Sequence, residues 1–289
     1  MVTASMVKEL RESTGAGMLD CKKALDETNG DMTKAVEWLR EKGISKAAKK
    51  ADRIAAEGLV NIVSEGNKAS IVELNSETDF VASNEQFTGL LKIISNLLLK
   101  NDVKTIEEAL NLKTEDGTLN DTIINKIAKI GEKISFRRFE NIVKEETDTF
   151  GIYIHSNKKS ATLVVLENGN SEVAKEIAMH ATAMRPKFIS RNDVPEEELN
   201  KEREIQKQIV INEGKPADIA EKIVEGRIVK YFKEICLNEQ PFVKNPDINV
   251  EQYAKENNAS VKVMIRYEVG EGMEKRKDNF AEEVMNQIK

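Results

Sequence analysis

The chain reads Ile71-Val72-Glu73-Leu74-Asn75-Ser76-Glu77-Thr78-Asp79-Phe80-Val81-Ala82-Ser83-Asn84 within its first third. The apolar run that begins this stretch predicts a strand, and Ser83 with Gln86, three residues apart, predicts a capping box that begins a helix. Phe80 therefore lies on a connection between a strand and a helix. An aromatic side chain on such a connection either folds back onto the core or points outward as an anchor for a partner. The local pattern leaves both orientations open.

The composition of the chain is that of a globular protein with a charged surface. It has 289 residues, enough for two domains or for one core with appendages, of which 40% are hydrophobic and 33% are charged. Its 44 Lys and Arg residues against 50 Asp and Glu residues give a net charge of −6. This balance argues against a protein whose whole surface binds nucleic acid. Cys21 and Cys236 lack the spacing of a zinc site and are expected to be reduced, with a long-range disulfide between them as the open alternative.

The sequence shows no membrane or export signal. No apolar stretch approaches the ~20 residues that span a bilayer. Residues 1–11 have neither the apolar segment of a signal peptide nor the Arg- and Ser-rich content of a transit peptide. We therefore expect a cytoplasmic protein that does not associate with membranes.

Residues 1–44 predict a bundle of three short helices. Asp31 can cap the third helix, and Gly43 is expected to close it. The apolar positions of the three helices are Met6, Val7 and Leu10, then Met18, Leu19, Ala24 and Leu25, then Met32, Ala35, Val36 and Leu39. Residues 45–57 predict a basic helical linker, which is either a solvated helix or a contact for an acidic partner or RNA.

Two β-hairpins, each followed by a helix, predict a duplicated β-β-α unit. The hairpins are expected over 59–74 and 150–166, and the helices over 87–98 and 173–184. Further strands are expected over 134–142 and 260–269, the second of which completes the second copy. The predicted fold class is therefore α+β, with core subdomains at 58–145 and at 146–194 plus 234–275.

Residues 195–233 predict a helical hairpin inserted into the second core subdomain. Its two charged helices have sparse apolar positions, which favours an antiparallel coiled-coil arm, whereas helices lying flat on the core would show wider apolar faces. The apolar positions are Leu199, Ile205 and Ile209 on one helix and Ile219, Ile223, Val224 and Ile228 on the other. A final helix is expected within 276–289.

Residues suited to catalysis are scarce. The two histidines, His155 and His180, do not stand in an arrangement that activates a nucleophile, and no phosphate-binding glycine loop is present. His180 lies in an amphipathic helix, where a packing role is favoured, whereas His155 ends a predicted strand and either packs or contacts a partner. We expect no catalytic residue, no metal ligand and no cofactor site.

Several long motifs occur along the chain in a characteristic order. They are Val7-Lys8-Glu9-Leu10-Arg11, the run from Thr14 to Leu25, Thr78-Asp79-Phe80-Val81-Ala82, Gly214-Lys215-Pro216 with Glu225-Gly226-Arg227, and Val269-Gly270-Glu271-Gly272. Together they resemble the elongation factor Ts family nearly end to end. The resemblance implies an N-terminal bundle like a ubiquitin-associated domain, two related α+β core subdomains, a coiled-coil arm and a C-terminal helix.

The resemblance also implies a function, which is guanine-nucleotide exchange on elongation factor Tu. In that family the phenylalanine of the Asp-Phe pair wedges between two helices of the partner's GTPase domain and displaces elements that hold Mg²⁺ and phosphates. The implied wedge is Phe80 with Asp79 as its polar companion and Thr78 and Val81 beside them. Further implied contacts are Ile130, Gly131, His155, Lys22 and Val243, whereas Lys244 departs from the apolar residue of some relatives. GDP, GTP and Mg²⁺ would belong to the partner.

Two other classes of protein compete with this interpretation. A non-exchanging adaptor would use the N-terminal bundle to bind ubiquitin-like or ribosomal partners, but it leaves the Asp79-Phe80 connection without a purpose. An enzyme ranks third, since only scattered carboxylates support it. The exchange interpretation involves no direct contact with nucleic acid and is compatible with a homodimer or a 2:2 complex with the partner.

Overall fold

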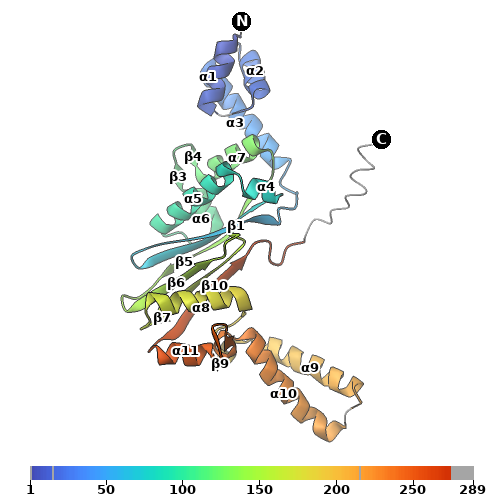
Figure 1. Ribbon diagram of the computed structural model, residues 1–289. Coiled ribbons are helices and arrows are strands. Elements are labelled where there is room, and N and C mark those ends of the chain that lie inside the picture. The colour runs from blue at the N-terminus through green and yellow to red at the C-terminus, as the bar shows by residue number, and fades with distance from the viewer. Residues whose placement is uncertain (1, 15, 215, 275–289) are drawn as a thin grey trace. The chain divides into compact units, whose positions relative to one another are not determined.

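The computed structural model describes residues 2–14, 16–214 and 216–274 (Figure 1). They form two compact units. The first contains the described residues up to Glu65, Ala69–Asn141 and those from Glu268 onward, and the second contains Gly66–Lys68 and Ile142–Tyr267. No helix in these ranges is long and apolar enough to cross a membrane. The C-terminal helix expected within 276–289 lies outside the described residues.

Three helices, α1 (Ala4–Thr14), α2 (Met18–Glu27) and α3 (Met32–Ala48), begin the first unit. Their apolar faces bury Leu10, Cys21, Ala24, Leu25 and Ala35. The side chain of Asp31 caps α3 by accepting a hydrogen bond from the backbone N–H of Lys34 at 3.1 Å, as predicted.

The end of α3 corrects two predictions. The helix does not close at Gly43 but continues to Ala48, and the buried Gly43 packs inside the helix close to Ala128. The linker at 45–57 is helical only to Ala48, beyond which bonds between residues three apart, such as Lys50 N–H to Ala47 O at 3.0 Å, tighten the chain into turns.

The sheet of the first unit has the strand order β1-β2-β5. Its strands are β1 (Glu57–Glu65), β2 (Lys68–Ser76) and β5 (Ile134–Val143). Helices lie on one face of this sheet (Figure 1). They are α4 (Asp79–Ala82), α5 (Glu85–Lys100), α6 (Ile106–Leu110) and α7 (Leu119–Ile130), with the short strands β3 (Lys113–Thr114) and β4 (Gly117–Thr118) between the last two. The periodic apolar face predicted for the helix at 87–98 is buried in α5.

The predicted capping box of Ser83 and Gln86 is wrong. Asn84 caps α5, since its Oδ1 accepts from the backbone N–H of Gln86 at 2.8 Å, whereas the Ser83 hydroxyl donates to Asp79 O at 3.0 Å. Ser83 instead closes the one-turn helix α4, which the sequence did not predict. Helix α4 begins at its own cap, Thr78.

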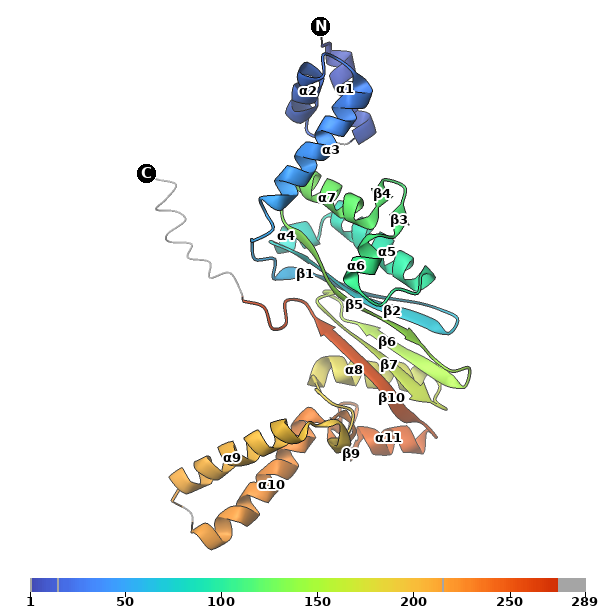
Figure 2. The same cartoon turned by 180° about the vertical axis from the view of Figure 1, so that it is seen from behind.

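The second unit repeats the strand arrangement. Its strands are β6 (Asp148–Ile154), β7 (Ser160–Glu167) and β10 (Ser260–Glu268), in the order β10-β7-β6. Figure 2 shows β10 beside β7. In both sheets the second strand of the hairpin is central and the last strand pairs with it, which is the strand order that a duplicated unit predicts. Helix α8 (Ser171–Met184) packs on β6 and β7, and α11 (Val250–Glu256) joins the same core.

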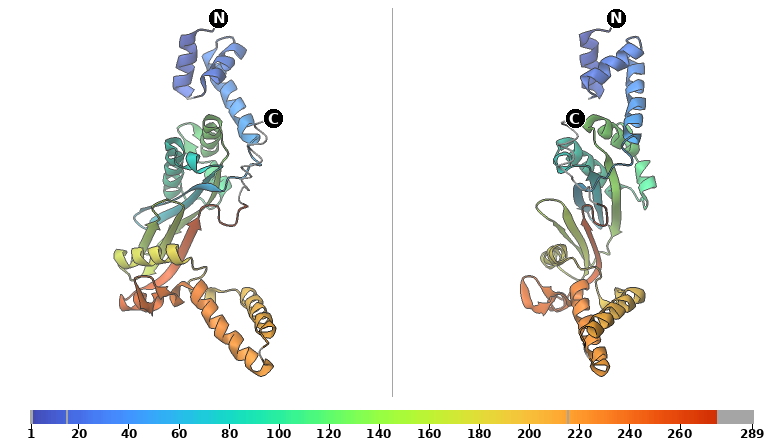
Figure 3. Two further views of the ribbon diagram at one scale, coloured as in Figure 1. Left: turned by 45° about the vertical axis from the view of Figure 1, so that its right-hand side comes forward. Right: turned by 90° about the vertical axis from the view of Figure 1, so that its right-hand side faces the viewer.

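Between α8 and α11 lie α9 (Glu196–Asn212) and α10 (Ala217–Ile235), which pack on each other (Figure 3). The short elements η1 (Arg191–Asp193), η2 (Leu237–Glu239), β8 (Pro241–Phe242) and β9 (Asn245–Asn249) flank them. The apolar stripe predicted for the first helix is wrong in part, because Ile205 and Ile209 are exposed and Val210 is buried. Charged side chains at the solvent-exposed margin also pair across the two helices, such as Arg203 with Glu225.

Candidate protein-binding site

Phe80 points away from the core of the first unit. Its side chain is 85% exposed, and it lies with Asp79 in the first half of α4. The second half of the same turn faces inward, where Ala82 is buried and Val81 packs against the core. Since four residues make one turn of helix, filling the inward side with Val81 and Ala82 leaves the outward side to Asp79 and Phe80.

A carboxylate from the end of α7 holds the start of α4. Glu132 accepts a hydrogen bond from the Thr78 backbone N–H at 3.0 Å and another from the Thr78 hydroxyl at 2.8 Å. The same hydroxyl oxygen accepts the Val81 N–H at 3.3 Å and so caps α4. We call Thr78 and Glu132 the α4 clamp.

Glu77 and Lys133 reinforce the clamp from either side. The Glu77 carboxylate accepts the Lys133 backbone N–H at 2.6 Å and pairs with Arg53 at 3.2 Å. The Lys133 ammonium donates to the carbonyl oxygens of Ala51 at 2.6 Å and Arg53 at 2.9 Å. The chain immediately before Phe80 is therefore tied to the loop after α7 and to the segment before β1.

Ile130 and Gly131 immediately precede Glu132 of the α4 clamp. Gly131 ends α7 with φ of 87°, in the left-handed region that favours glycine, and its N–H donates to Ile127 O at 2.9 Å. Gly131 is exposed, and Ile130 is partly buried against the core. The structure thus brings two of the predicted contact segments, 78–81 and 130–131, together through hydrogen bonds between their neighbours.

Lys22 is exposed on α2, and exposed apolar residues lie near it on the same helix. Leu19, one turn earlier on the same face, is 84% exposed, and Met18 is 57% exposed. Both residues belong to the apolar positions predicted for this helix. Leu19 could have been recognised, because it falls out of phase with the buried positions Cys21, Ala24 and Leu25.

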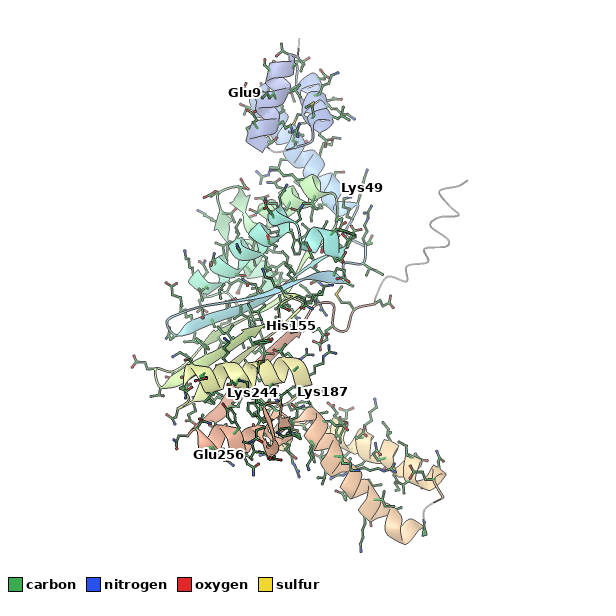
Figure 4. All side chains as sticks on the ribbon, viewed as in Figure 1. Glu9, Lys49, His155, Lys187, Lys244 and Glu256 are labelled. Carbon is green, nitrogen blue, oxygen red and sulfur yellow. The ribbon has the colours of Figure 1, made fainter. Side chains whose placement is uncertain are left out.

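In the second unit, His155 lies exposed in the turn after β6 (Figure 4). Its Nδ1 is 3.1 Å from Asn157 Oδ1, and its carbonyl oxygen accepts the Lys158 N–H at 2.7 Å. The ring stands edge-on to Tyr153, with the ring centroids 6.4 Å apart. The imidazole of His155 thus contacts its own turn and the strand before it, while its backbone N–H donates to Ser160 O of β7 at 2.9 Å.

Val243 is 45% exposed and follows the buried Phe242. Its neighbour Lys244, labelled in Figure 4, pairs with Glu176 of α8. Lys244 first and the Tyr253 hydroxyl second lower the pKa of the Glu176 carboxyl. His180 is fully buried, which confirms the packing role predicted for it, and its Nδ1 accepts the Val243 N–H at 3.1 Å.

A carboxylate at the start of α7 supports the fold by linking α7 to α3. The Thr118 backbone N–H first and Arg40 second lower the pKa of Asp121 to about 2. Asp121 caps α7 and pairs with Arg40 of α3 at 2.7 Å. Within the described ranges, no group of three or more His, Cys, Asp and Glu side chains is arranged to hold a metal ion.

The chain matches a known protein family. The family model described as Elongation factor TS matches residues 77–271, about two thirds of the chain. The matched range begins at the Glu77 that flanks the α4 clamp and contains every predicted contact residue except Lys22.

Proposed function

The chain belongs to the elongation factor TS family, and we propose that it binds elongation factor Tu carrying GDP and promotes release of the nucleotide. In this proposal Phe80 enters the GTPase domain of the partner and disturbs the site that holds Mg²⁺ and the phosphates. Mg²⁺, GDP and GTP belong to the partner, and this chain contributes an interface without catalysing a covalent reaction.

The observation that carries the proposal is the exposed Phe80 on a fixed backbone. A large aromatic side chain has few rotatable bonds and buries much apolar area, which makes it an effective anchor. The α4 clamp restrains the main chain on which the ring stands. An anchor that is restrained before binding loses less conformational entropy on binding, so more of the contact energy is available to distort the partner.

The mechanism is differential binding. A chain that binds the nucleotide-free partner more tightly than the GDP-bound partner must weaken GDP binding by the same factor. Phe80 supplies this difference if its ring fits only the arrangement in which the Mg²⁺ and phosphate contacts are displaced. Asp79, exposed beside it, supplies a polar contact at the rim of the same site.

The remaining predicted contacts extend the proposed interface. Ile130 and Gly131 adjoin the α4 clamp and would meet the partner with Phe80. Lys22 presents a charge from the N-terminal bundle. His155 and Val243 present an imidazole and an apolar side chain from the second unit, where both are exposed.

The release of a fluorescent GDP analogue from elongation factor Tu tests the function. We expect that adding the chain increases the dissociation rate and that the effect saturates with chain concentration. An adaptor would bind the partner and leave the nucleotide dissociation rate unchanged. That result would contradict the proposal, and it would favour the adaptor if sizing showed that a complex had formed.

A further inference from the structure

The buried ring of His180 holds the segment that carries Val243. His180 lies in α8, and its Nδ1 is 3.1 Å from the backbone nitrogen of Val243. A backbone N–H can only donate, so Nδ1 must be an unprotonated acceptor. In the neutral ring the proton is then on Nε2, which lies 3.0 Å from Gln240 Oε1.

Gln240 is oriented independently of the histidine. Its Nε2 donates to Glu234 O at 2.7 Å and to Met184 O at 3.4 Å, which leaves Oε1 to accept from His180. The Gln240 carbonyl oxygen accepts the Val250 N–H at 3.1 Å. Because Gln240 is 1% exposed, water does not readily replace these bonds. Both ring nitrogens of His180 therefore have fixed partners.

The residues on either side of Val243 are held as firmly. Phe242 is 2% exposed and stacks on Tyr253 of α11, with the ring centroids 4.1 Å apart. Lys244 pairs with Glu176, one turn before His180 on the same face of α8. The side chain of Val243 is left exposed while its backbone and both neighbours are anchored.

We propose that His180 is a positioning residue for nucleotide exchange, because its neutral ring fixes the Val243 backbone and so presents the valine side chain to an apolar patch on the partner. This inference rests on the proposed function, since it assigns Val243 to the interface with elongation factor Tu. The hydrogen bond lowers the entropy that ordering this segment would otherwise cost on binding.

The surroundings of His180 favour the neutral ring. Burial lowers its pKa, and the hydrogen bond to Gln240 opposes this only in part. The titratable side chains facing this region are Glu176 from α8, Lys244 from the β8–β9 turn and Tyr253 from α11. Glu176 bonds both of the others, so these groups are satisfied among themselves.

Two substitutions of His180 in the full chain separate positioning from packing. In His180→Asn, Oδ1 branches from Cγ as Nδ1 does and keeps an acceptor for the Val243 N–H. In His180→Gln the amide lies one carbon further out, so it can meet Gln240 but not the Val243 N–H. We expect hydrogen exchange of the Val243 amide to be about tenfold faster in His180→Gln and close to wild type in His180→Asn.

The same variants are then compared in the GDP-release assay. We expect His180→Gln to raise the half-saturating concentration of the chain about tenfold at an unchanged maximal rate, and His180→Asn to restore it. In a Val243→Ala background, His180→Gln should have no further effect. If wild type and His180→Gln reach half of the maximal GDP-release rate at the same chain concentration, the inference is overturned.

Two results keep this test distinct from the test of function. If the wild-type chain releases no GDP, the proposed function fails, while the Val243 amide still reports whether His180 holds it. If His180→Gln does not fold, the nitrogen NMR chemical shifts of the His180 ring in the wild-type chain show which ring nitrogen carries the proton. A proton on Nε2 with Nδ1 unprotonated is expected, and the opposite tautomer would overturn the inference.

Discussion

Phe80 is exposed because its neighbours already fill the inward side of α4. Burying a phenylalanine side chain stabilises a fold by ~1.5–3 kcal/mol, so an exposed ring forgoes that contribution. Single exposed apolar residues are common and do not by themselves indicate a site. What distinguishes Phe80 is the restraint on the chain before it, since Glu132 bonds to Thr78 and the Glu77 carboxylate bonds to the Lys133 N–H.

Glu132 is therefore expected to act through Phe80 rather than by touching the partner. In Glu132→Ala both hydrogen bonds from Thr78 are lost, and each such hydrogen bond contributes ~1 kcal/mol of stability. We predict that the half-saturating concentration for GDP release rises about fivefold while the maximal rate changes little. Stopped-flow measurements over a range of chain concentrations separate the two quantities.

Glu132→Gln and Glu65→Ala serve as controls for this prediction. The glutamine keeps one acceptor for Thr78 and should give an intermediate value. Glu65 lies exposed at the end of β1, and its removal should have no effect. A Glu132→Ala chain that matches wild type in half-saturation would show that the α4 clamp does not position Phe80.

Most elements with strong periodicity could be predicted from the sequence, and short ones could not. The two hairpins, α5 and the helical hairpin follow from apolar spacing and turn residues. The partner was implied by the resemblance of the sequence motifs to the family. Helix α4 was missed because one turn contains no repeat from which a period can be read. The inward Val210 was missed because the face of a helix that packs depends on a neighbouring element, whereas the exposed Leu19 could have been recognised from its helical phase.

The cap of α7 should make the fold sensitive to acid. The pKa of Asp121 falls from 3.8 to about 2 in the folded chain, because the Thr118 N–H and Arg40 stabilise the carboxylate. A carboxyl group whose pKa is lower when folded stabilises the protein above its unfolded pKa. That contribution is lost as the pH falls from about 4 towards 2.

Asp121→Asn should remove this part of the pH dependence. We predict that the variant is less stable than wild type at pH 7 and that the difference shrinks as the pH falls from 4 towards 2. Free energies of unfolding from urea titrations at several pH values measure both quantities. A constant difference across this range would mean that the charge of Asp121 does not stabilise the fold.

For the whole molecule, nucleotide exchange couples two binding equilibria of elongation factor Tu, one with the chain and one with GDP. We predict that saturating GDP weakens binding of the chain to elongation factor Tu by the same factor by which the chain weakens GDP binding. Titration calorimetry of the partner with and without GDP measures the first factor, and nucleotide titrations with and without the chain measure the second. Unequal factors would show that the chain or the nucleotide has a further binding state.

The exposed ring of Phe80 is the centre of this account, and the rate of GDP release from elongation factor Tu in the presence of Phe80→Ala tests it most directly. Truncating a central interface aromatic removes ~2 kcal/mol or more of binding, about thirtyfold in affinity. Val143→Ala is the matched control, because Val143 is also an exposed apolar residue. We predict that Phe80→Ala keeps its unfolding temperature and loses most of the acceleration of GDP release, whereas Val143→Ala keeps both. A folded Phe80→Ala chain that releases GDP as fast as wild type would contradict the account.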